Sequence, residues 1–295
     1  NICLFGGRPR LFDCIEFNDR IATVDVLYDF AFLLMDLWHR DLPGFANLAM
    51  NRYLDETGDE DGFVLLPFFM AVRAAVRAHV TATQAAETAG GGAHLAEAAR
   101  SYFELARALL RPAQGGLVAI GGLSGSGKTT VAEALAASVG APPGARIVES
   151  DRVRKGLFGV SAETRLPDTA YAPEISARVY RILAERAEAM LRAGGSVVVD
   201  AVFDRPGNRA LVEAAARAVG APFHGFWLEA DAARLRDRVI GRVGGPSDAT
   251  AAVLARQLAR DLGEMAWTRV DAGRPLAEVV GAISDLVGNA RPPVD

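Results

Sequence analysis

The chain has 295 residues, 51% of them hydrophobic, which suffices for two domains with a buried core each. A net charge of −4 and a pI near 5.7 argue against a nucleic-acid-binding surface. The two cysteines, Cys3 and Cys14, are too few for a disulfide framework, and both lie in apolar runs, as buried thiols of a reducing cytosol do.

The sequence shows no pattern of a signal peptide and no apolar run of membrane-spanning length. Nothing in the sequence resembles a signal peptide. The most apolar run, residues 63–72, spans about ten residues, contains Pro67 and is too short to cross a membrane. We therefore expect a cytoplasmic protein with no membrane partner. The chain begins at Asn1, inside what reads as a domain, so we also expect it to be a fragment.

The first 112 residues read as a β-hairpin followed by helices. Residues 2–5 and 10–15 flank a turn containing Gly6, Gly7 and Pro9. The apolar patterns and the glycine triplet at 90–92 predict four helices, at residues 24–40, 45–54, 63–86 and 93–110. Proline and glycine in residues 111–116 mark a linker to a second domain, 117–295.

Three stretches of the first domain carry a family resemblance. The sequences NICLF at residues 1–5, LFDCIEF at 11–17 and VDVLYD at 24–29 resemble the C-terminal lobe of aminoglycoside-phosphotransferase-like kinases. They are more similar still to bacterial two-part proteins that join such a domain to a P-loop kinase.

This resemblance implies roles for three residues. Asn1 and Asp13 fall at the two metal ligands of the family, and Asp29 at the buried acid that braces the catalytic loop. Alternatively, Asp13 ends a strand, and Asp25 and Asp29 are surface acids. The catalytic Asp and the nucleotide-binding N-terminal lobe of that family have no counterpart here. We therefore expect a truncated lobe that misses its N-terminal lobe as a partner, with a vestigial metal site.

The second domain opens on a phosphate-binding motif. Residues 122–129, GLSGSGKT, fit the P-loop pattern G-x-x-x-x-G-K-[ST] between an apolar run and a helical pattern. Glycines let backbone N–H groups converge on phosphates, Lys128 would reach the β- and γ-phosphates, and Thr129 would hold Mg²⁺. The residues expected to bind ATP are Gly122, Ser124, Gly125, Ser126, Gly127, Lys128, Thr129 and Thr130.

Strands and helices then alternate, which predicts an α/β domain with a parallel sheet. The expected strands are residues 117–120, 147–149, 196–199, 223–229 and 267–270. The expected helices begin at Thr129, Pro173, Pro206, Asp231, Asp248 and Pro275, with Asp231 and Asp248 as N-caps. In such folds the ligand binds at the carboxyl ends of the strands.

Polar residues cluster at two of these strand ends. Asp151 follows the second strand and is the candidate general base, with Arg152 and Arg154 as substrate-binding cations. The alternative is an N-cap followed by a solvated basic helix face. Asp200 ends the run Val197–Val199, which has the form of a Walker B strand, and would ligate Mg²⁺ unless it only caps a turn.

Further arginines follow in the sequence. Asp204, Arg205 and Arg209 could touch substrate or lie on the surface; of these we expect Arg205 to bind substrate. Arg234, Arg238 and Arg242 recur at i, i+4 and i+8 before the glycine-rich segment 244–247. They predict a mobile lid in which Arg238 and Arg242 are catalytic, or else an exposed arginine face.

The second domain resembles small P-loop kinases akin to gluconate kinase, chloramphenicol phosphotransferase and the zeta toxins. This resemblance implies the strand order 2-3-1-4-5 and supports Asp151 as the acid that acts on the acceptor hydroxyl.

The leading hypothesis is an ATP- and Mg²⁺-dependent phosphotransferase acting on a small-molecule hydroxyl. Two alternatives stay open: a nucleotide-binding regulatory ATPase module that gates the fused phosphotransferase-like domain, and a 5′-hydroxyl polynucleotide kinase. The acidic pI makes nucleic acid an unlikely partner.

Overall fold

The computed structural model describes residues 2–11, 23–88, 92–242 and 244–288. Asn1 and Asp13 lie outside these ranges, so their assignment as metal ligands stays a prediction.

A β-hairpin opens the chain, as the sequence predicts. Strands β1 (Ile2–Phe5) and β2 (Arg8–Leu11) pair antiparallel, so the second strand begins two residues earlier than expected. Gly6 and Gly7 form the turn with φ of 58° and 73°. Positive φ at both central residues is what a two-residue hairpin turn requires, which is why glycine occupies them.

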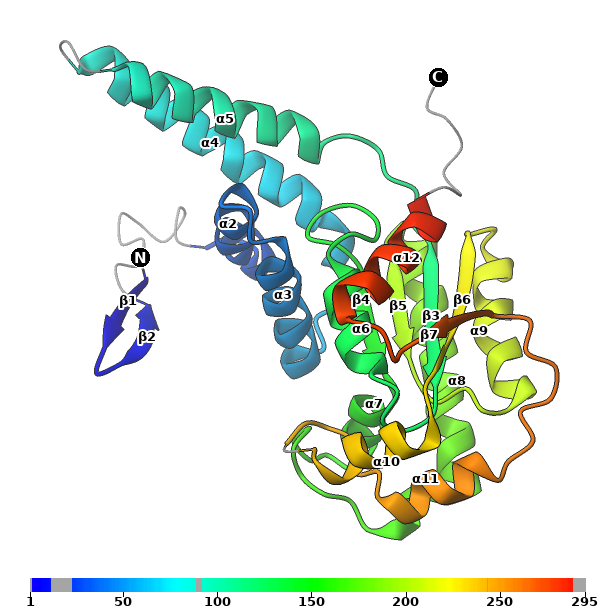
Figure 1. The fold of residues 1–295 in the computed structure, drawn as a ribbon. Coiled ribbons are helices and arrows are strands. Elements are labelled where there is room, and N and C mark those ends of the chain that lie inside the picture. The colour runs from blue at the N-terminus through cyan, green and yellow to red at the C-terminus, as the bar shows by residue number, and fades with distance from the viewer. Residues whose placement is uncertain (1, 12–22, 89–91, 243, 289–295) are drawn as a thin grey trace.

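Among the described residues, four α-helices follow before the linker, at nearly the predicted places. They are α2 (Val26–His39), α3 (Pro43–Thr57), α4 (Leu66–Glu87) and α5 (Ala93–Leu109), with a 3-10 turn η1 (Phe63–Leu65) before α4. Helices α4 and α5 form a long antiparallel pair that extends away from the sheet (Figure 1). By length and composition residues Phe63–Glu87 could cross a membrane, although the same holds for core helices. The expectation that the run at residues 63–72 is too short to cross a membrane is therefore wrong on length, and 33% of the 18-residue window lies buried inside the structure.

Two acids of α2 have surface roles. Asp25 is the N-cap and accepts a hydrogen bond from the backbone N–H of Leu27 at 2.8 Å. The side chain of Asp29 is 69% exposed and pairs with Arg73 at 3.2 Å. Asp29 is therefore a surface acid, and the expected buried brace is wrong for the described structure.

The second region is an α/β domain around five parallel strands. These are β3 (Leu117–Gly122), β4 (Arg146–Glu149), β5 (Val197–Asp200), β6 (Phe223–Glu229) and β7 (Thr268–Asp271). Their order is β4-β5-β3-β6-β7, which confirms the predicted 2-3-1-4-5 arrangement. The order places the carboxyl ends of β4, β5 and β3 side by side.

Helices cover the sheet in two layers. Helix α6 (Lys128–Ala136) packs with α12 (Leu276–Gly288), and α8 (Pro173–Arg192) packs with α9 (Pro206–Ala218). The remaining elements lie around the carboxyl end of the sheet (Figure 1). They are α7 (Ser150–Leu157), η2 (Asp168–Tyr171), α10 (Ala232–Ile240) and α11 (Ala251–Leu258).

Three local expectations need correction. Helix α7 begins directly after β4 and lies outside the expected helices, because it is only eight residues long and mostly polar. Helix α10 ends at Ile240, so Arg242 does not continue the helical arginine row. Thr250, not Asp248, caps α11 by accepting from the Val253 N–H, because Asp248 is held by other partners.

Helix α3 covers the edge of the sheet. The side chains of Asn47 and Asn51, each 1% exposed, donate to the Ala145 carbonyl next to β4 at 3.0 and 3.2 Å. Asn51 Oδ1 accepts from the Ile147 N–H at 2.7 Å. An uncovered edge strand exposes unpaired backbone groups. The two asparagines therefore satisfy the edge in place of a sixth strand.

One apolar core also joins the two regions. It includes Leu34 and Met70 from the first region and Leu183 and Val197 from the second. The boundary predicted at residues 112–117 thus separates two parts that pack against each other.

We expect Asn51→Ala to lower the free energy of unfolding by about 3 kcal/mol, because it leaves the buried Ile147 N–H without its acceptor and also removes the bond to Ala145. Urea denaturation measures this loss. The matched control is Asn208→Ala on α9, expected within about 0.5 kcal/mol of wild type. Equal stability of both variants would contradict the role given to Asn51.

Candidate nucleotide and phosphoryl-transfer site

The loop between β3 and α6 has the geometry of a phosphate cradle. Gly125 and Gly127 have φ of 85° and 89°, which favours glycine at both positions. A Cβ on Gly125 would lie 2.5 Å from the Leu235 carbonyl oxygen of α10, whereas one on Gly127 would meet nothing within 4 Å. The loop is thus packed tightly on its α10 side and open at Gly127, where α6 begins.

The polar groups of this loop fit a phosphate. The nine-residue helix α6 presents its N-terminal N–H groups and the positive end of its dipole. Ser126 is 2% exposed, and its hydroxyl has no hydrogen-bond partner among the described residues. Lys128 Nζ donates to the Leu123 carbonyl at 3.2 Å, and burial lowers the pKa of Lys128, opposed by the charges of Asp200 and Asp151.

Thr129 and Asp200 meet, as the Walker B interpretation requires. The Thr129 hydroxyl donates to Asp200 Oδ2 at 2.6 Å, across the gap between the first turn of α6 and the end of β5. Asp200 is 2% exposed, and burial raises its pKa to about 6 although Lys128 opposes the shift. A hydroxyl and a carboxylate together are hard oxygen ligands of the kind that Mg²⁺ takes.

Asp151 lies in the same group of charges. Asp151 lies in the first turn of α7. Among the neighbouring charges, that of Lys128 has the largest effect on the pKa of Asp151. Burial raises the pKa of Asp151, and Lys128 and a hydrogen bond from the Ser247 side chain oppose the rise. The structure therefore joins Thr129 to Asp200, and the charges of Lys128, Asp151 and Asp200 act on one another.

The basic residues of α7 are not a solvated face. Arg154 is 6% exposed, donates from Nη1 to the Ala170 carbonyl at 2.7 Å, and has its guanidinium carbon 4.6 Å from the centre of the Tyr171 ring. Its Nε has no hydrogen-bond partner, and no carboxylate pairs with it in the part of the chain that the structure describes. The charge of Arg154 lowers the pKa of Asp151, three residues earlier, so a buried cation stands near the candidate base.

Lys155 has a structural role. It is 1% exposed and pairs with Asp248 at 2.7 Å. The same Asp248 oxygen accepts from the Leu166 N–H at 3.0 Å and the Tyr171 hydroxyl at 2.7 Å. Asp248 thereby ties the end of the segment between α10 and α11 to the loop after α7, and the predicted hinge at residues 244–247 stays a prediction.

The two arginines expected in the lid, Arg238 and Arg242, have different surroundings in the structure. Arg238 donates to the carbonyls of Gly125 and Ala272 at 3.4 and 3.1 Å, which holds α10 on the P-loop. Arg242 is exposed and lines a polar cavity of about 380 Å³ together with Arg165, Ser247 and Asp248. Only Arg242 is therefore placed to reach a ligand, because Arg238 is occupied by backbone oxygens.

Three further residues that the sequence offered as substrate contacts have no described contact with Lys128, Thr129, Asp151 or Asp200. Arg205 is exposed at the N-cap of α9, and no described contact connects it to the P-loop. Asp204 is buried in an ion pair with Arg260. Arg209 donates to the carbonyls of Phe203, Leu262 and Glu264 at 3.0, 2.9 and 2.7 Å, so it holds loops together.

Glu149 is the site residue that sequence reasoning missed. It ends β4 in register with Asp200 at the end of β5, and it is 6% exposed. Burial raises the pKa of Glu149 to about 8, reinforced by the charges of Asp200 and Asp151 and opposed by Arg152, whose Nε donates to Glu149 at 3.1 Å. The signal was present, since an acid ends the apolar run 147–149 just as Asp200 ends its own.

These features define an α/β domain with a P-loop: a parallel sheet of order β4-β5-β3-β6-β7, a GKT loop after its central strand, and an acid at the end of the neighbouring strand. Residues 117–261 match the model of the family described as AAA domain. The match covers the P-loop, both acidic strand ends and helices α10 and α11. It does not include the first 116 residues.

Curated relatives extend over both regions. The uncharacterized proteins Rv2004c of Mycobacterium tuberculosis and Mb2027c of Mycobacterium bovis are each 30% identical to this chain over 285 residues. The alignment covers 95% of this chain and 56% of each relative. The chain thus spans about half the length of the curated relatives it matches.

Solved structures of similar fold include several kinases. A gluconokinase from Sinorhizobium meliloti is 25% identical, with a TM-score of 0.41 and coverage of 61% of this chain and 94% of that one. A sugar kinase from Janibacter is 22% identical, with a TM-score of 0.43 and coverage of 60% and 96%. The APS kinase of M. tuberculosis, in complex with AMPPNP and APS, is 21% identical, with a TM-score of 0.41 and coverage of 60% and 99%.

The raised pKa of Glu149 predicts a pH effect on stability. Between its unfolded pKa of about 4.3 and its folded pKa of about 8, the native state holds a proton that the unfolded chain releases. The contribution of Glu149 to stability is therefore greatest below this window and is lost as the pH rises through it. We expect the melting temperature of Glu149→Gln to rise relative to wild type between about pH 5 and pH 8.5.

Thermal unfolding in the presence of EDTA measures this difference. Glu163→Gln, which changes an exposed glutamate, serves as the control and should run parallel to wild type at all pH values. Parallel curves for Glu149→Gln as well would refute the raised pKa.

Proposed function

We propose that the chain is an ATP- and Mg²⁺-dependent phosphotransferase that moves the γ-phosphoryl group of ATP to a hydroxyl of a small molecule. The observation that carries this proposal is the contact between Thr129 and Asp200 beside Lys128, at the start of the P-loop helix. Phosphoryl transfer depends on positioning and on charge stabilisation more than on covalent chemistry of the protein. The buried charges at this edge of the sheet meet that need.

Each residue has a role in this proposal. The N–H groups of residues 124–130 and the Lys128 ammonium bind the phosphates of ATP. Thr129 and Asp200 would hold Mg²⁺, which when bound offsets the negative charge of the phosphates. Arg242 is the candidate for the cation that approaches the transferring group, because it is exposed beside the cavity next to Asp248.

Asp151 acts on the acceptor. Its carboxylate accepts the proton of the acceptor hydroxyl as that oxygen forms a bond to the γ-phosphorus, while the bond from the γ-phosphorus to the bridging oxygen breaks and ADP leaves. The raised pKa of Asp151, caused by burial, makes it a stronger base than an exposed aspartate. The buried Arg154 three residues later favours an acceptor that carries an anionic group near its hydroxyl.

Arg152 and Arg205 are less direct candidates for substrate binding. Arg152 is engaged by carboxylates through its Nε, and Arg205 is exposed at the N-cap of α9. Both stay in the proposal as residues at the border of the acceptor site.

The regulatory alternative is favoured by one observation, the shared core between the helical region and the P-loop domain. In that alternative, nucleotide binding gates a phosphotransferase-like neighbour. The family match stops short of residues 1–112, so their resemblance to an aminoglycoside-phosphotransferase lobe stays a prediction. So do the cytoplasmic location, the absence of membrane and nucleic-acid partners, and the activity of any longer protein.

We expect Lys128→Ala to abolish ATP consumption and to weaken ATP binding at least tenfold, because it removes the ammonium group that faces the phosphates. The fold should survive, since Lys128 makes one weak hydrogen bond to the Leu123 carbonyl. Calorimetric titration with Mg²⁺·ATP measures the loss. Arg192→Ala, at a 59% exposed arginine, is the control and should bind like wild type. Undiminished binding by Lys128→Ala would remove the P-loop from the mechanism.

We expect Asp151→Asn to bind ATP within about twofold of wild type but to lower phosphoryl transfer by roughly 10² to 10⁴-fold, the usual size of general-base catalysis. ADP release is measured with a panel of D-gluconate, D-glucose, kanamycin, adenosine and a 5′-hydroxyl oligonucleotide. Asp237→Asn, at an exposed acid of α10, is the control. Transfer retained by Asp151→Asn would refute the general base. Transfer to no member of the panel by wild type, with ATP still bound, would favour the regulatory alternative.

A further inference from the structure

The polar cavity beside α10 is formed by separate stretches of the chain. Its volume is about 380 Å³, a size that admits a small molecule. The loop after α7 contributes Arg165, and the chain just after α10 contributes Arg242. The stretch that leads into α11 contributes Ser247, Asp248 and Thr250. Three polar stretches thus meet around one space.

This cavity adjoins the phosphoryl-transfer site at two points. Ser247 lines the cavity, and its side chain forms a hydrogen bond with Asp151, the candidate base. Arg242 lines the cavity as well, and its charge acts on Lys128 of the P-loop. A phosphoryl acceptor has to lie between the base and the phosphates. The cavity is next to both.

The walls of the cavity carry uncompensated positive charge. Asp248 is the one carboxylate that lines it within the described ranges, and a single oxygen of Asp248 accepts from Lys155, from the Leu166 N–H and from the Tyr171 hydroxyl. Arg165 and Arg242 are both exposed, and the described part of the chain offers neither a hydrogen bond nor an ion pair. Because a guanidinium stays charged at any ordinary pH, the cavity attracts anions.

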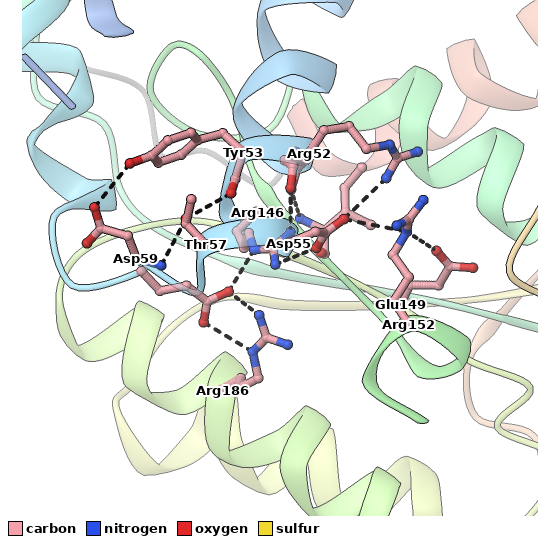
Figure 2. Close-up of polar contacts among 12 residues, drawn as sticks. Arg52, Tyr53, Asp55, Thr57, Asp59, Arg146, Glu149, Arg152 and Arg186 are labelled. Carbon is pink, nitrogen blue, oxygen red and sulfur yellow. Dashed lines mark hydrogen bonds and ion pairs between the residues drawn. The ribbon is translucent and has the colours of Figure 1, made fainter. Parts of the chain in front are cut away.

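Other arginines near the site are already engaged. The Nε of Arg152 donates to Glu149 at 3.1 Å and lies 3.5 Å from a carboxylate oxygen of Asp55 (Figure 2). Arg238 is held by two backbone carbonyls. Arg165 is therefore the arginine on the α7 side of the cavity that is free to bind a ligand.

The lining also indicates the rest of the ligand. No aromatic side chain is found among the described residues that line the cavity, so a nucleobase or another flat ring has nothing to stack on. Ser247 and Thr250 carry hydroxyl groups, which both donate and accept hydrogen bonds. Such walls favour a small molecule with several hydroxyl groups.

We propose that this cavity is the acceptor site and that Arg165 is its specificity residue, which binds a carboxylate or phosphate group of a small polyhydroxylated acceptor. The acceptor hydroxyl then lies toward Ser247 and Asp151. Arg242 is left for the transferring phosphoryl group, because its charge already acts on Lys128. The inference rests on the proposed phosphotransferase and names the class of its acceptor, a sugar acid or a sugar phosphate. A polycation such as an aminoglycoside is disfavoured by the same charge.

Binding of matched pairs of probes to the full chain tests this assignment. The pairs are D-gluconate with D-glucitol, and D-ribose 5-phosphate with D-ribose, so each pair compares an anion with its neutral counterpart. Calorimetric titrations are made at saturating Mg²⁺·AMPPNP, which fills the P-loop and keeps the anions from binding there. We expect the anionic member of at least one pair to bind about tenfold more tightly, the effect of a charge-assisted hydrogen bond. The pair that responds distinguishes carboxylate from phosphate.

Three variants identify the residue responsible. Arg165→Gln should lose the preference for the anion, whereas Arg165→Lys keeps the charge and should keep most of the preference. Both should fold, because the side chain is exposed. Arg217→Gln makes the same change of charge at an exposed arginine of α9 and should bind the probes like wild type.

The outcomes separate this inference from the proposed function. Equal binding within both pairs, binding of neither anion, or a preference that persists in Arg165→Gln would overturn the assignment of the cavity. A preference that Arg165→Gln abolishes, without ADP release from Mg²⁺·ATP, would support the anion site and refute the phosphotransferase. Failure of AMPPNP to bind would refute the nucleotide site. The same pairs measured on Lys128→Ala, whose P-loop lacks its ammonium group, would then still decide the assignment of the cavity.

Discussion

The need to pair buried charge at one edge of the sheet governs this structure. Asp200 and Glu149 are buried where β5 and β4 end, beside the half-buried Lys128, and an isolated charge in such a place is costly. Thr129 donates to Asp200 and Arg152 donates to Glu149, yet burial still raises the pKa of both acids. That imbalance suits a site that takes up phosphate and a cation, because the ligand supplies the charge that the protein lacks.

The surroundings of the site follow from the same need. Arg154 and Lys155 lie on a helix that looks like a surface helix in sequence, yet both are buried, one against Tyr171 and the other against Asp248. Arg238 is taken up by carbonyl groups of the P-loop and of the loop after β7. The arginines that hold the structure together are thus separated from those that face solvent, such as Arg242.

The helical region completes the α/β domain. The sheet would end at β4 with unpaired backbone groups, and Asn47 and Asn51 of α3 satisfy them. The same helix supplies Asp55 to arginines of β4 and α7. The helical region therefore covers the β4 edge of the P-loop domain and supplies charged partners to it.

The sequence by itself determined the local features of this protein. The P-loop, the five strands and the positions of Lys128, Thr129, Asp151 and Asp200 follow from patterns a few residues long, because glycine geometry, strand apolarity and helix starts are local properties. The strand order came from the family resemblance, not from such patterns. Only the tertiary structure decided the partners of the charged residues. Asp248 binding Lys155, Arg238 binding carbonyls, and Asp55 sharing Arg152 with Glu149 join segments that lie far apart in the chain. Long charged side chains take whichever partner the packing of the backbone brings within reach, and that choice leaves no periodic signal in the sequence.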